Sequence, residues 1–411
     1  MNLKVFLIWS LITLMVFSIG FSAVTITFWY ALGGYKGQVF KSMLDEFAKE
    51  HPDIKINALY SGNYSGTAQK VIAAIASKTL PNGGLIPAGP LFTGGEGDYT
   101  VTDYIYSKDG LPLDDFYPVV WDYAKYRGKI CAIPFNISTP IMLYNKDLLK
   151  KAGLNPNEPP TTWQELMEYA KKVVKNVPGT WGINMKDTPW IFKAMLFANG
   201  GSIIDPETLT PMFNRIEGIE VAEMWKDLID KKLMPVGLHQ LADKEFFGNT
   251  LAFYLGSSSR VGKWYGKTNF SFGTAFLPRI KKYAIPIGGA TLVLFHHNKT
   301  QDDATWKLIK WLVSTDNIVK WSEKTGYVPI RKSAVNSSEM QSFLKEHPEY
   351  RPPFEQLKYG SAYWHFESMG NMDGFIWEAL DKIERGVETP TKALDEAADK
   401  LIEDIKTSEK E

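Results

Sequence analysis

Two acidic residues late in the chain are the first candidates for catalysis. Glu367 and Asp373 flank the segment Gly370-Asn371-Met372. A glycoside hydrolase needs two carboxyl groups held at a fixed separation on either side of a glycosidic bond. The sequence does not fix the separation of these two groups, and acidic side chains on a solvated surface are the simpler interpretation. A secreted glycoside hydrolase therefore stays open as an alternative function.

Other residues that catalyse reactions or bind metals do not occur in a recognisable pattern. The sequence lacks G-x-S-x-G, a Walker-type phosphate loop, H-E-x-x-H and C-x-x-C, the spacings that position nucleophiles, phosphates and metals. His296 and His297 are adjacent, so on a strand they point to opposite faces and would not share a metal. Gly33-Gly34 lacks the rest of a dinucleotide-binding fingerprint and is interpreted as a turn. We expect no enzyme, no metal and no cofactor.

The N-terminal segment has the composition of an export signal. Lys4 supplies a positive charge, the run from Phe6 to Val24 is almost entirely apolar, and the run ends in small residues. We predict a signal peptide at residues 1–23 and a periplasmic or otherwise extracytoplasmic protein. An uncleaved anchor is the alternative, because the run approaches the roughly 20 residues that span a bilayer.

Composition narrows the class of protein further. The 411 residues carry 46 basic and 46 acidic side chains without runs of either sign, which argues against a nucleic-acid partner. Cys131 is the only cysteine, so neither an internal disulfide nor a lipid anchor after the apolar run is expected. This length exceeds what one hydrophobic core usually supports, and two domains are the expectation.

The first segment after residue 23 has the pattern of a strand, a helix and a strand. Residues 24–29 alternate and are rich in β-branched side chains, residues 39–47 place apolar side chains on one helical face, and residues 54–59 alternate again. This order predicts a βαβ unit of a parallel sheet. A second helix follows, for which we predict Val71, Ile72 and Ile75 on the inward face.

Later segments extend the alternation of strands and helices. Residues 81–100 are predicted to be loop because glycine and proline interrupt every period. A helix is predicted to begin after a Thr161 or Thr162 cap, and a strand is predicted at 284–296. Helices are predicted at 303–319 and 390–406. The fold class is therefore α/β, and a ligand is expected beyond the carboxyl ends of the strands.

Short segments along nearly the whole chain after residue 23 occur in a familiar order. They are Phe28-Trp29, Tyr60–Tyr64, Ile133–Pro140, Tyr144–Asp147, Pro160–Trp163, Gly288–Thr291, Lys324–Pro329 and Gly370–Met372. With these segments the chain resembles the extracellular solute-binding proteins of carbohydrate-type ABC importers, and most closely their glycerol-3-phosphate-binding subgroup.

The resemblance implies a two-lobed periplasmic-binding-protein fold of type II, with the ligand between the lobes. It implies crossing segments near Pro134 and Gly288 and a third around residues 330–350. The corresponding lobes would be residues 24–133 plus 290–340 and residues 134–289 plus 341–411. Hinge closure on the ligand would create the form that the membrane subunits of the importer recognise.

Residues of a ligand site are also implied by the resemblance, position by position. They are Trp29, Tyr64, Ser138, Trp190, a serine of the 257–259 run represented by Ser257, Gly289 and Tyr327. Hydroxyl groups and glycine amides offer directional hydrogen bonds, and flat rings cover the apolar face of a sugar or polyol. Core packing remains the alternative for each aromatic residue.

The sequence departs from the glycerol-phosphate-binding subgroup where a phosphate would be held. The subgroup carries an arginine four residues after its Gly-Asn-Met segment, and that position here is Ile376, with Asp373 nearby. Isoleucine cannot replace the bidentate, charge-assisted contact of an arginine. Glu96 or Asp98 is the candidate for the subgroup's acidic pocket residue, and Asp187 occupies the place of a tryptophan.

These observations predict the extracytoplasmic substrate-binding component of an ABC transporter for a neutral sugar or polyol, such as a monosaccharide, inositol or a short oligosaccharide. The alternative within the class is glycerol-3-phosphate or another phosphorylated polyol. We expect a monomer whose partners are the small ligand and the importer's membrane subunits.

Overall fold

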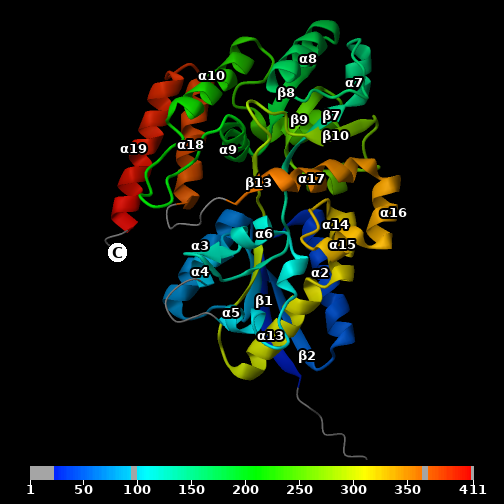
Figure 1. Ribbon diagram of the computed structural model, residues 1–411, viewed down its shortest axis with the longest axis vertical. Coiled ribbons are helices and arrows are strands. Elements are labelled where there is room, and N and C mark those ends of the chain that lie inside the picture. The colour runs from blue at the N-terminus through cyan, green and yellow to red at the C-terminus, as the bar shows by residue number, and fades with distance from the viewer. Residues whose placement is uncertain (1–22, 94–99, 363–368, 409–411) are drawn as a thin grey trace, which may run out of the picture.

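The computed structural model describes residues 23–93, 100–362 and 369–408. The predicted signal peptide, apart from Ala23, lies outside the described residues, as do Glu96, Asp98 and Glu367. Within the described part, no helix has both the length and the apolar character that crossing a membrane would require. Figure 1 shows two bodies stacked along the long axis of the molecule, each built around its own sheet.

The first lobe is built around a five-stranded sheet in the order β2-β1-β3-β12-β6. Strands β2 and β3 run parallel to β1, whereas β12 runs antiparallel to its neighbours β3 and β6. The strands are β1 (Val24–Tyr30), β2 (Ile54–Tyr60), β3 (Gly83–Ile86), β6 (Ile133–Pro134) and β12 (Thr291–Leu294). The predicted βαβ unit is confirmed, with each strand one residue longer than predicted.

Helices cover both faces of this sheet. Ile26, Phe28 and Tyr30 of β1 pack into the main core on one face, whereas Trp29 packs on the opposite face, as the alternation of a strand requires. The helices and short strands of this part are α2 (Gly34–Glu50), α3 (Tyr64–Ser77), α4 (Gly89–Thr93), α5 (Thr100–Ile105), α6 (Pro118–Tyr123), β4 (Lys125–Tyr126), β5 (Lys129–Ile130), α13 (Lys299–Leu312), α14 (Thr315–Thr325), α15 (Lys332–Asn336) and α16 (Ser338–Glu346).

The prediction of a loop over residues 81–100 was wrong for most of the described part of that range, and residues 94–99 lie outside it. Residues Gly83–Ile86 form β3 in the middle of the sheet, and Gly89–Thr93 form α4. The two glycines are required there, because a Cβ at Gly83 would lie 2.7 Å from the carbonyl oxygen of Val293 and one at Gly84 would lie 2.8 Å from that of Trp29. Close approach of neighbouring strands, and not a turn, explains the glycines.

The inward face of α3 was also predicted only in part. Val71 is fully buried, but Ile72 is 59% exposed and Ile75 is 45% exposed. The buried side chains of α3 are Thr67, Val71 and Ala74, which recur at the spacing of one helical face. The two isoleucines form a second apolar stripe that faces solvent.

The second lobe is built around a four-stranded sheet in the order β10-β7-β9-β8, in which β7 is antiparallel to both neighbours and β8 is parallel to β9. Its elements are β7 (Pro140–Asn145), α7 (Lys146–Lys151), α8 (Trp163–Asn176), β8 (Trp181–Met185), α9 (Thr188–Ala198), α10 (Ile216–Asp230), α11 (Ala242–Phe247), β9 (Leu251–Ser257), α12 (Arg260–Trp264), β10 (Phe272–Phe276), α18 (Met369–Glu384) and α19 (Pro390–Ser408).

Helix α8 begins as the sequence predicts. Thr162 is its N-cap, and its side chain accepts from the Glu165 backbone N–H at 3.1 Å while Glu165 accepts from the Thr162 N–H at 3.2 Å. This reciprocal pair is a capping box. The predicted strand at 284–296 is instead divided into β11 (Ile285–Pro286) and β12, and the predicted helix at 303–319 is divided between α13 and α14.

The chain passes between the two sheets several times. It leaves β6 of the first sheet and enters β7 of the second, and it returns through β11 to β12. Figure 1 shows α17 (Arg351–Gln356) and β13 (Gly360–Ser361) between the two bodies. The predicted lobe boundaries at residues 133, 289 and 340 stay predictions.

Candidate functional site

Side chains from both sides of this junction meet in a polar cluster, which we call the lysine–tyrosine cluster: Lys36, Tyr64, Asn136, Ser259 and Tyr327. The Lys36 Nζ donates to the Tyr327 hydroxyl at 3.2 Å and to the Ser259 Oγ at 3.3 Å. The Asn136 Nδ2 donates to the Tyr64 hydroxyl at 2.8 Å. Electrostatic and hydrogen-bonding interaction of the two tyrosine hydroxyls completes the cluster.

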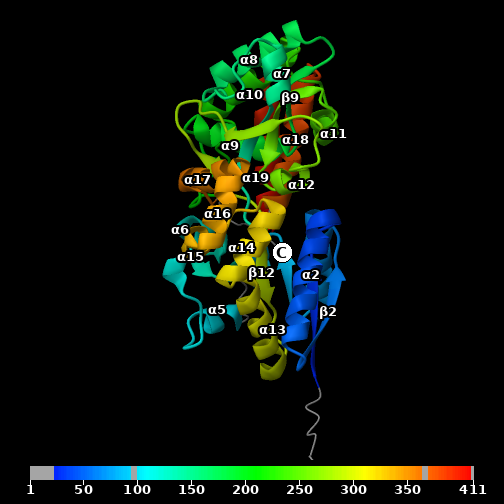
Figure 2. The same ribbon diagram turned by 90° about the vertical axis from the view of Figure 1, so that its right-hand side faces the viewer.

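Helix ends position three of these side chains. Lys36 lies in the first turn of α2, which begins at the edge of the first sheet that faces the second lobe (Figure 2). Tyr64 is the first residue of α3, whose start is fixed by the Asn63 side chain accepting from the Gly66 N–H at 2.8 Å. Gly326, with φ +74°, ends α14 and directs Tyr327 into the cluster.

The ring of Tyr327 is held by packing. It stacks on Trp321 with 5.6 Å between ring centroids and an interplanar angle of 8°, and the Lys36 Nζ lies 5.2 Å from the Tyr327 centroid. Only 3% of Tyr327 is exposed. Its hydroxyl therefore has a fixed position, with a cation on one side and Tyr64 on the other.

The two tyrosines differ in acidity. Burial, together with the neighbouring Tyr327 and Tyr123, holds the pKa of Tyr64 well above its usual value. Burial opposes ionisation of Tyr327 as well, but the charge of Lys36 and hydrogen bonds from Asn136, Lys36 and Tyr64 outweigh it and lower the pKa of Tyr327. The Tyr327 hydroxyl is thus the more acidic of the two.

Asn136 and Gly289 fix the backbone beneath the cluster. The Asn136 Oδ1 accepts from the Ala290 N–H at 2.8 Å, which directs its amide nitrogen toward Tyr64 and Tyr327. Gly289 has φ +139°, and a Cβ there would lie 2.2 Å from the Asn136 carbonyl oxygen. The Tyr123 hydroxyl donates to the Gly289 carbonyl at 3.1 Å. Gly289 is therefore a backbone requirement of this site.

The predicted serines lie next to the cluster. The Ser257 Oγ is 2.9 Å from the Ser259 Oγ, which links Ser257 to Lys36 through one hydroxyl. Ser138 is buried and pairs with Gly288 through two backbone hydrogen bonds of 2.8 and 3.0 Å. Ser138 therefore joins the two crossing segments.

The two predicted tryptophans are placed differently. The ring of Trp190 lies against Gly288, 3.1 Å from the position of a Cβ there, and its buried indole N–H has no hydrogen-bond partner among the described residues. Trp29 instead packs with Val71, Ile86 and their neighbours on the α3 side of the first sheet. The structure thus brings Tyr64, Tyr327, Gly289 and the serines together and places Trp29 in a hydrophobic cluster.

The residues that departed from the subgroup pattern have structural partners. Ile376 is fully buried in the core of the second lobe, so this position does not report on charge at the cluster. Asp373 pairs with the buried Lys193 at 2.7 Å. Asp187 interacts electrostatically with Arg260 and Tyr254.

Sequence reasoning missed Lys36 and Asn136. Asn136 lies within a segment that the resemblance used, and Lys36 lies three residues after Gly33, at the start of a predicted helix. Among the described residues no group of His, Cys, Asp and Glu side chains suits a metal ion.

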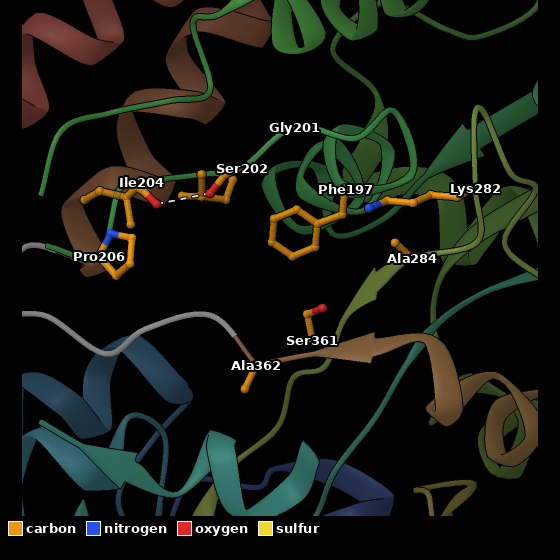
Figure 3. Close-up of a pocket in the computed structure, with 10 residues that line it drawn as sticks. Phe197, Gly201, Ser202, Ile204, Pro206, Lys282, Ala284, Ser361 and Ala362 are labelled. Atoms are coloured by element: carbon orange, nitrogen blue, oxygen red, sulfur yellow. Dashed lines mark hydrogen bonds between the residues drawn. The ribbon is translucent and has the colours of Figure 1, made fainter. Parts of the chain in front are cut away.

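A separate pocket of about 310 Å³ lies beside β13 (Figure 3). Its polar side chains are Ser202, Lys282 and Ser361, and Phe197 forms an apolar wall. Ser202 donates to the Ile204 carbonyl at 3.1 Å. None of the ligand residues predicted from the sequence lines this pocket, so it is distinct from the lysine–tyrosine cluster.

Comparison with known proteins identifies relatives over most of the chain. The family described as bacterial extracellular solute-binding protein matches residues 42–351. The sn-glycerol-3-phosphate-binding periplasmic protein UgpB of Escherichia coli is 28% identical over 403 residues, covering 92% of this chain and 91% of that protein.

Solved structures share the fold. UgpB from Mycobacterium tuberculosis, in complex with glycerophosphocholine, has a TM-score of 0.84 at 24% identity and covers 94% of this chain and 99% of that one. A cyclic α-maltosyl-1,6-maltose binding protein from Arthrobacter globiformis has a TM-score of 0.79 at 24% identity, with coverage of 92% and 98%. The predicted two-lobed α/β fold is confirmed.

Proposed function

The chain belongs to the bacterial extracellular solute-binding protein family, and from this premise we propose that it is the substrate-binding component of an ABC importer for a small polyhydroxylated solute. The proposal includes export of the chain, a monomeric state and capture of the ligand between the two lobes. It assigns no catalysis to the protein.

The observation that carries the proposal is the meeting of hydroxyl groups from separate elements at the junction of the lobes. Tyr64 begins α3 of the first lobe, and Tyr327 follows α14. Ser257 is the last residue of β9 in the second lobe, and Ser259 lies two residues later. Hydroxyl groups both donate and accept, which suits the alternating donors and acceptors of a sugar or polyol. Stacked rings at Tyr327 and Trp321 give this site a rigid wall.

In this proposal the lobes close on the ligand by a hinge motion, and the importer recognises the closed form. Lys36 and Ser259 belong to different lobes and lie 3.3 Å apart, so a ligand touching both would favour the closed arrangement. A ligand shifts such an equilibrium only through contacts that differ between the two states. Contacts that bridge the lobes meet this condition.

Two classes of ligand are candidates for this site. The prediction of a neutral sugar or polyol from the sequence rested on Ile376, Asp373 and Asp187, and the structure buries Ile376 in the core. The relatives named for sn-glycerol-3-phosphate and glycerophosphocholine support a phosphorylated polyol, whereas the cyclic maltosyl-maltose binding protein supports a sugar.

A thermal-shift panel tests the proposed function. The compounds are myo-inositol, glucose, maltose, cyclic maltooligosaccharides, glycerol-3-phosphate and glycerophosphocholine. A ligand specific for the folded protein raises the midpoint of unfolding by mass action, so we expect at least one compound to do so. No shift with any compound would contradict the proposal.

The glycoside hydrolase alternative is addressed by the same samples. Asp373, one of its two carboxylates, is held by Lys193, which leaves it poorly placed to serve as a nucleophile. Release of a sugar from a nitrophenyl glycoside would favour the hydrolase, and binding without product favours transport.

A further inference from the structure

We propose that Lys36 is an anion-recognition residue, which binds an oxyanion of the ligand, a phosphoryl or carboxylate group on a polyol. The inference rests on the proposed function and narrows its ligand class. It concerns a residue that the family-based prediction of the site did not include.

The first argument is the state of the Lys36 charge. Lys36 is half-buried, and its two hydrogen-bond acceptors are the hydroxyls of Tyr327 and Ser259. Within residues 23–93, 100–362 and 369–408, Lys36 forms no ion pair with a carboxylate. A partly desolvated ammonium group that meets only neutral acceptors is less well stabilised than one paired with an anion. An oxyanion of the ligand would supply the missing negative charge.

The second argument is the number of donors. A lysine ammonium group carries three N–H donors, and two of them are used by the protein. The third is available to a ligand that already contacts Tyr327 and Ser259. Hydrogen bonds between an ammonium and an oxyanion are shorter and stronger than those to a hydroxyl, so the available donor favours an anionic over a neutral group.

The third argument is the local field. Helix α2 begins at Gly34 with no side-chain cap at Gly33 and no acidic residue in its first turn, and the N-terminus of a helix favours negative charge. The Lys267 Nζ lies 4.6 Å from the ring centroid of Tyr35, the residue before Lys36. A second lysine, from the other lobe, thus contacts a side chain of the first turn of this helix.

A purely structural role for Lys36 makes a different prediction. If Lys36 served only to join the lobes through Ser259, its removal would shift the closing equilibrium and weaken every ligand by the same factor. If Lys36 binds an oxyanion, its removal weakens charged ligands selectively. The ratio of affinities for charged and neutral ligands separates the two roles.

The experiment is isothermal titration calorimetry of the purified protein with matched pairs. Glycerol-3-phosphate is compared with glycerol, glucose-6-phosphate with glucose, and glucuronate with glucose, so that phosphoryl and carboxylate groups are distinguished. The variants are Lys36→Gln, Lys36→Arg, which keeps the charge, and Lys41→Gln on the same helix as a control. Lys41 is exposed and pairs with Asp45 at 2.8 Å.

We expect the wild-type protein to prefer the charged member of at least one pair. Lys36→Gln should lower the affinity for that ligand by roughly 10- to 100-fold, because one charge-assisted hydrogen bond is lost. Lys36→Arg should restore most of the affinity, and Lys41→Gln should leave it unchanged. Circular dichroism checks that each variant is folded.

Three results would overturn the inference. If the wild-type protein prefers the neutral members or binds neutral sugars alone, the proposed function stands and the anion assignment falls. Equal weakening of charged and neutral ligands by Lys36→Gln would leave Lys36 a structural contact. Binding of no compound here and none in the thermal-shift panel would remove the proposed function itself.

Discussion

Two polar clusters of this protein differ in how their side chains are partnered. In the second lobe, Glu384 accepts from the Trp225 indole N–H at 2.7 Å and from the Gly237 N–H at 2.8 Å, and the His239 Nε2 lies 2.6 Å from it. The His239 Nδ1 lies 3.0 Å from the Asn184 Oδ1. Each of these groups has a partner within the protein.

The lysine–tyrosine cluster is different because its cation meets only hydroxyl groups. Lys36 contacts Tyr327 and Ser259, and neither carries a carboxylate. Complete matching is what a buried network needs for stability. A lysine that has no carboxylate partner in the protein can instead pair with an anionic group of a ligand. Under the proposed function, the Glu384 network serves the fold and the lysine–tyrosine cluster serves recognition of the ligand.

The largest expected effect is a loss of stability when the Glu384 network is broken. Glu384→Ala removes the acceptor of Trp225, Gly237 and His239 and leaves buried donors without partners, so the free energy of unfolding should fall by about 3–5 kcal/mol. Glu384→Gln keeps one acceptor and should cost less. Urea denaturation measures both. If Glu384→Ala instead left stability intact and abolished ligand binding, the comparison would be reversed.

Gly289→Ala is expected to displace the backbone that holds the lysine–tyrosine cluster in place. A Cβ at φ +139° and 2.2 Å from the Asn136 carbonyl oxygen forces the backbone to move, with an expected loss of about 2–4 kcal/mol in unfolding free energy. Ligand affinity should fall with it, since Asn136 orients Tyr64. The matched control is Gly374→Ala in α18, where a Cβ has open space; a similar loss there would show that the effect is not local.

Tyr64→Phe removes a single hydroxyl group from the lysine–tyrosine cluster and so tests its role alone. The change removes the Tyr64 acceptor of the Asn136 Nδ2, for an expected loss of about 1–2 kcal/mol in stability. It also removes a predicted ligand contact, so calorimetry should show roughly tenfold weaker binding because one hydrogen bond is lost. Tyr106→Phe, at a residue that is 61% exposed, should change neither quantity. Unaltered affinity in Tyr64→Phe would remove Tyr64 from the site.

The smallest effect is expected at Asp115, whose charge is matched but nearer to solvent. Burial alone would raise its pKa, but hydrogen bonds from Ser333 and Arg331 outweigh it and hold the pKa below 3.8. A lowered pKa in the folded state gives stability that is present above pH 3.8 and is lost as the pH falls through the folded-state value.

Asp115→Asn should therefore cost about 1 kcal/mol at neutral pH and little at low pH. Urea denaturation from pH 7 to pH 3 measures the difference between the variant and the wild-type protein. A difference that stays constant over this range would show that the charge of Asp115 is not what matters.

Local patterns predicted the elements that depend on local chemistry. The alternation in β1, the apolar face of α2 and the Thr162 cap of α8 are each set by residues within a few positions of one another. Gly83 and Gly84 were misread because a glycine in a central strand and a glycine in a turn look alike until the neighbouring strand is known.

The site was predictable only where a family pattern covered it. Tyr64, Tyr327 and Gly289 were reached through the resemblance, and the structure brings them together. Lys36 was not, because its partners Ser259 and Tyr327 are 223 and 291 positions away in the chain. Nothing in the spacing around Lys36 indicates that its side chain would meet them.

A crystal structure of the protein with the tightest ligand from the titrations tests the central claim most directly. The account predicts that the ligand lies against Tyr64, Tyr327 and Ser259, with an oxyanion within hydrogen-bonding distance of the Lys36 Nζ. A ligand found instead in the pocket beside β13, between Phe197 and Ser361, with Lys36 still bound only to hydroxyl groups, would contradict it.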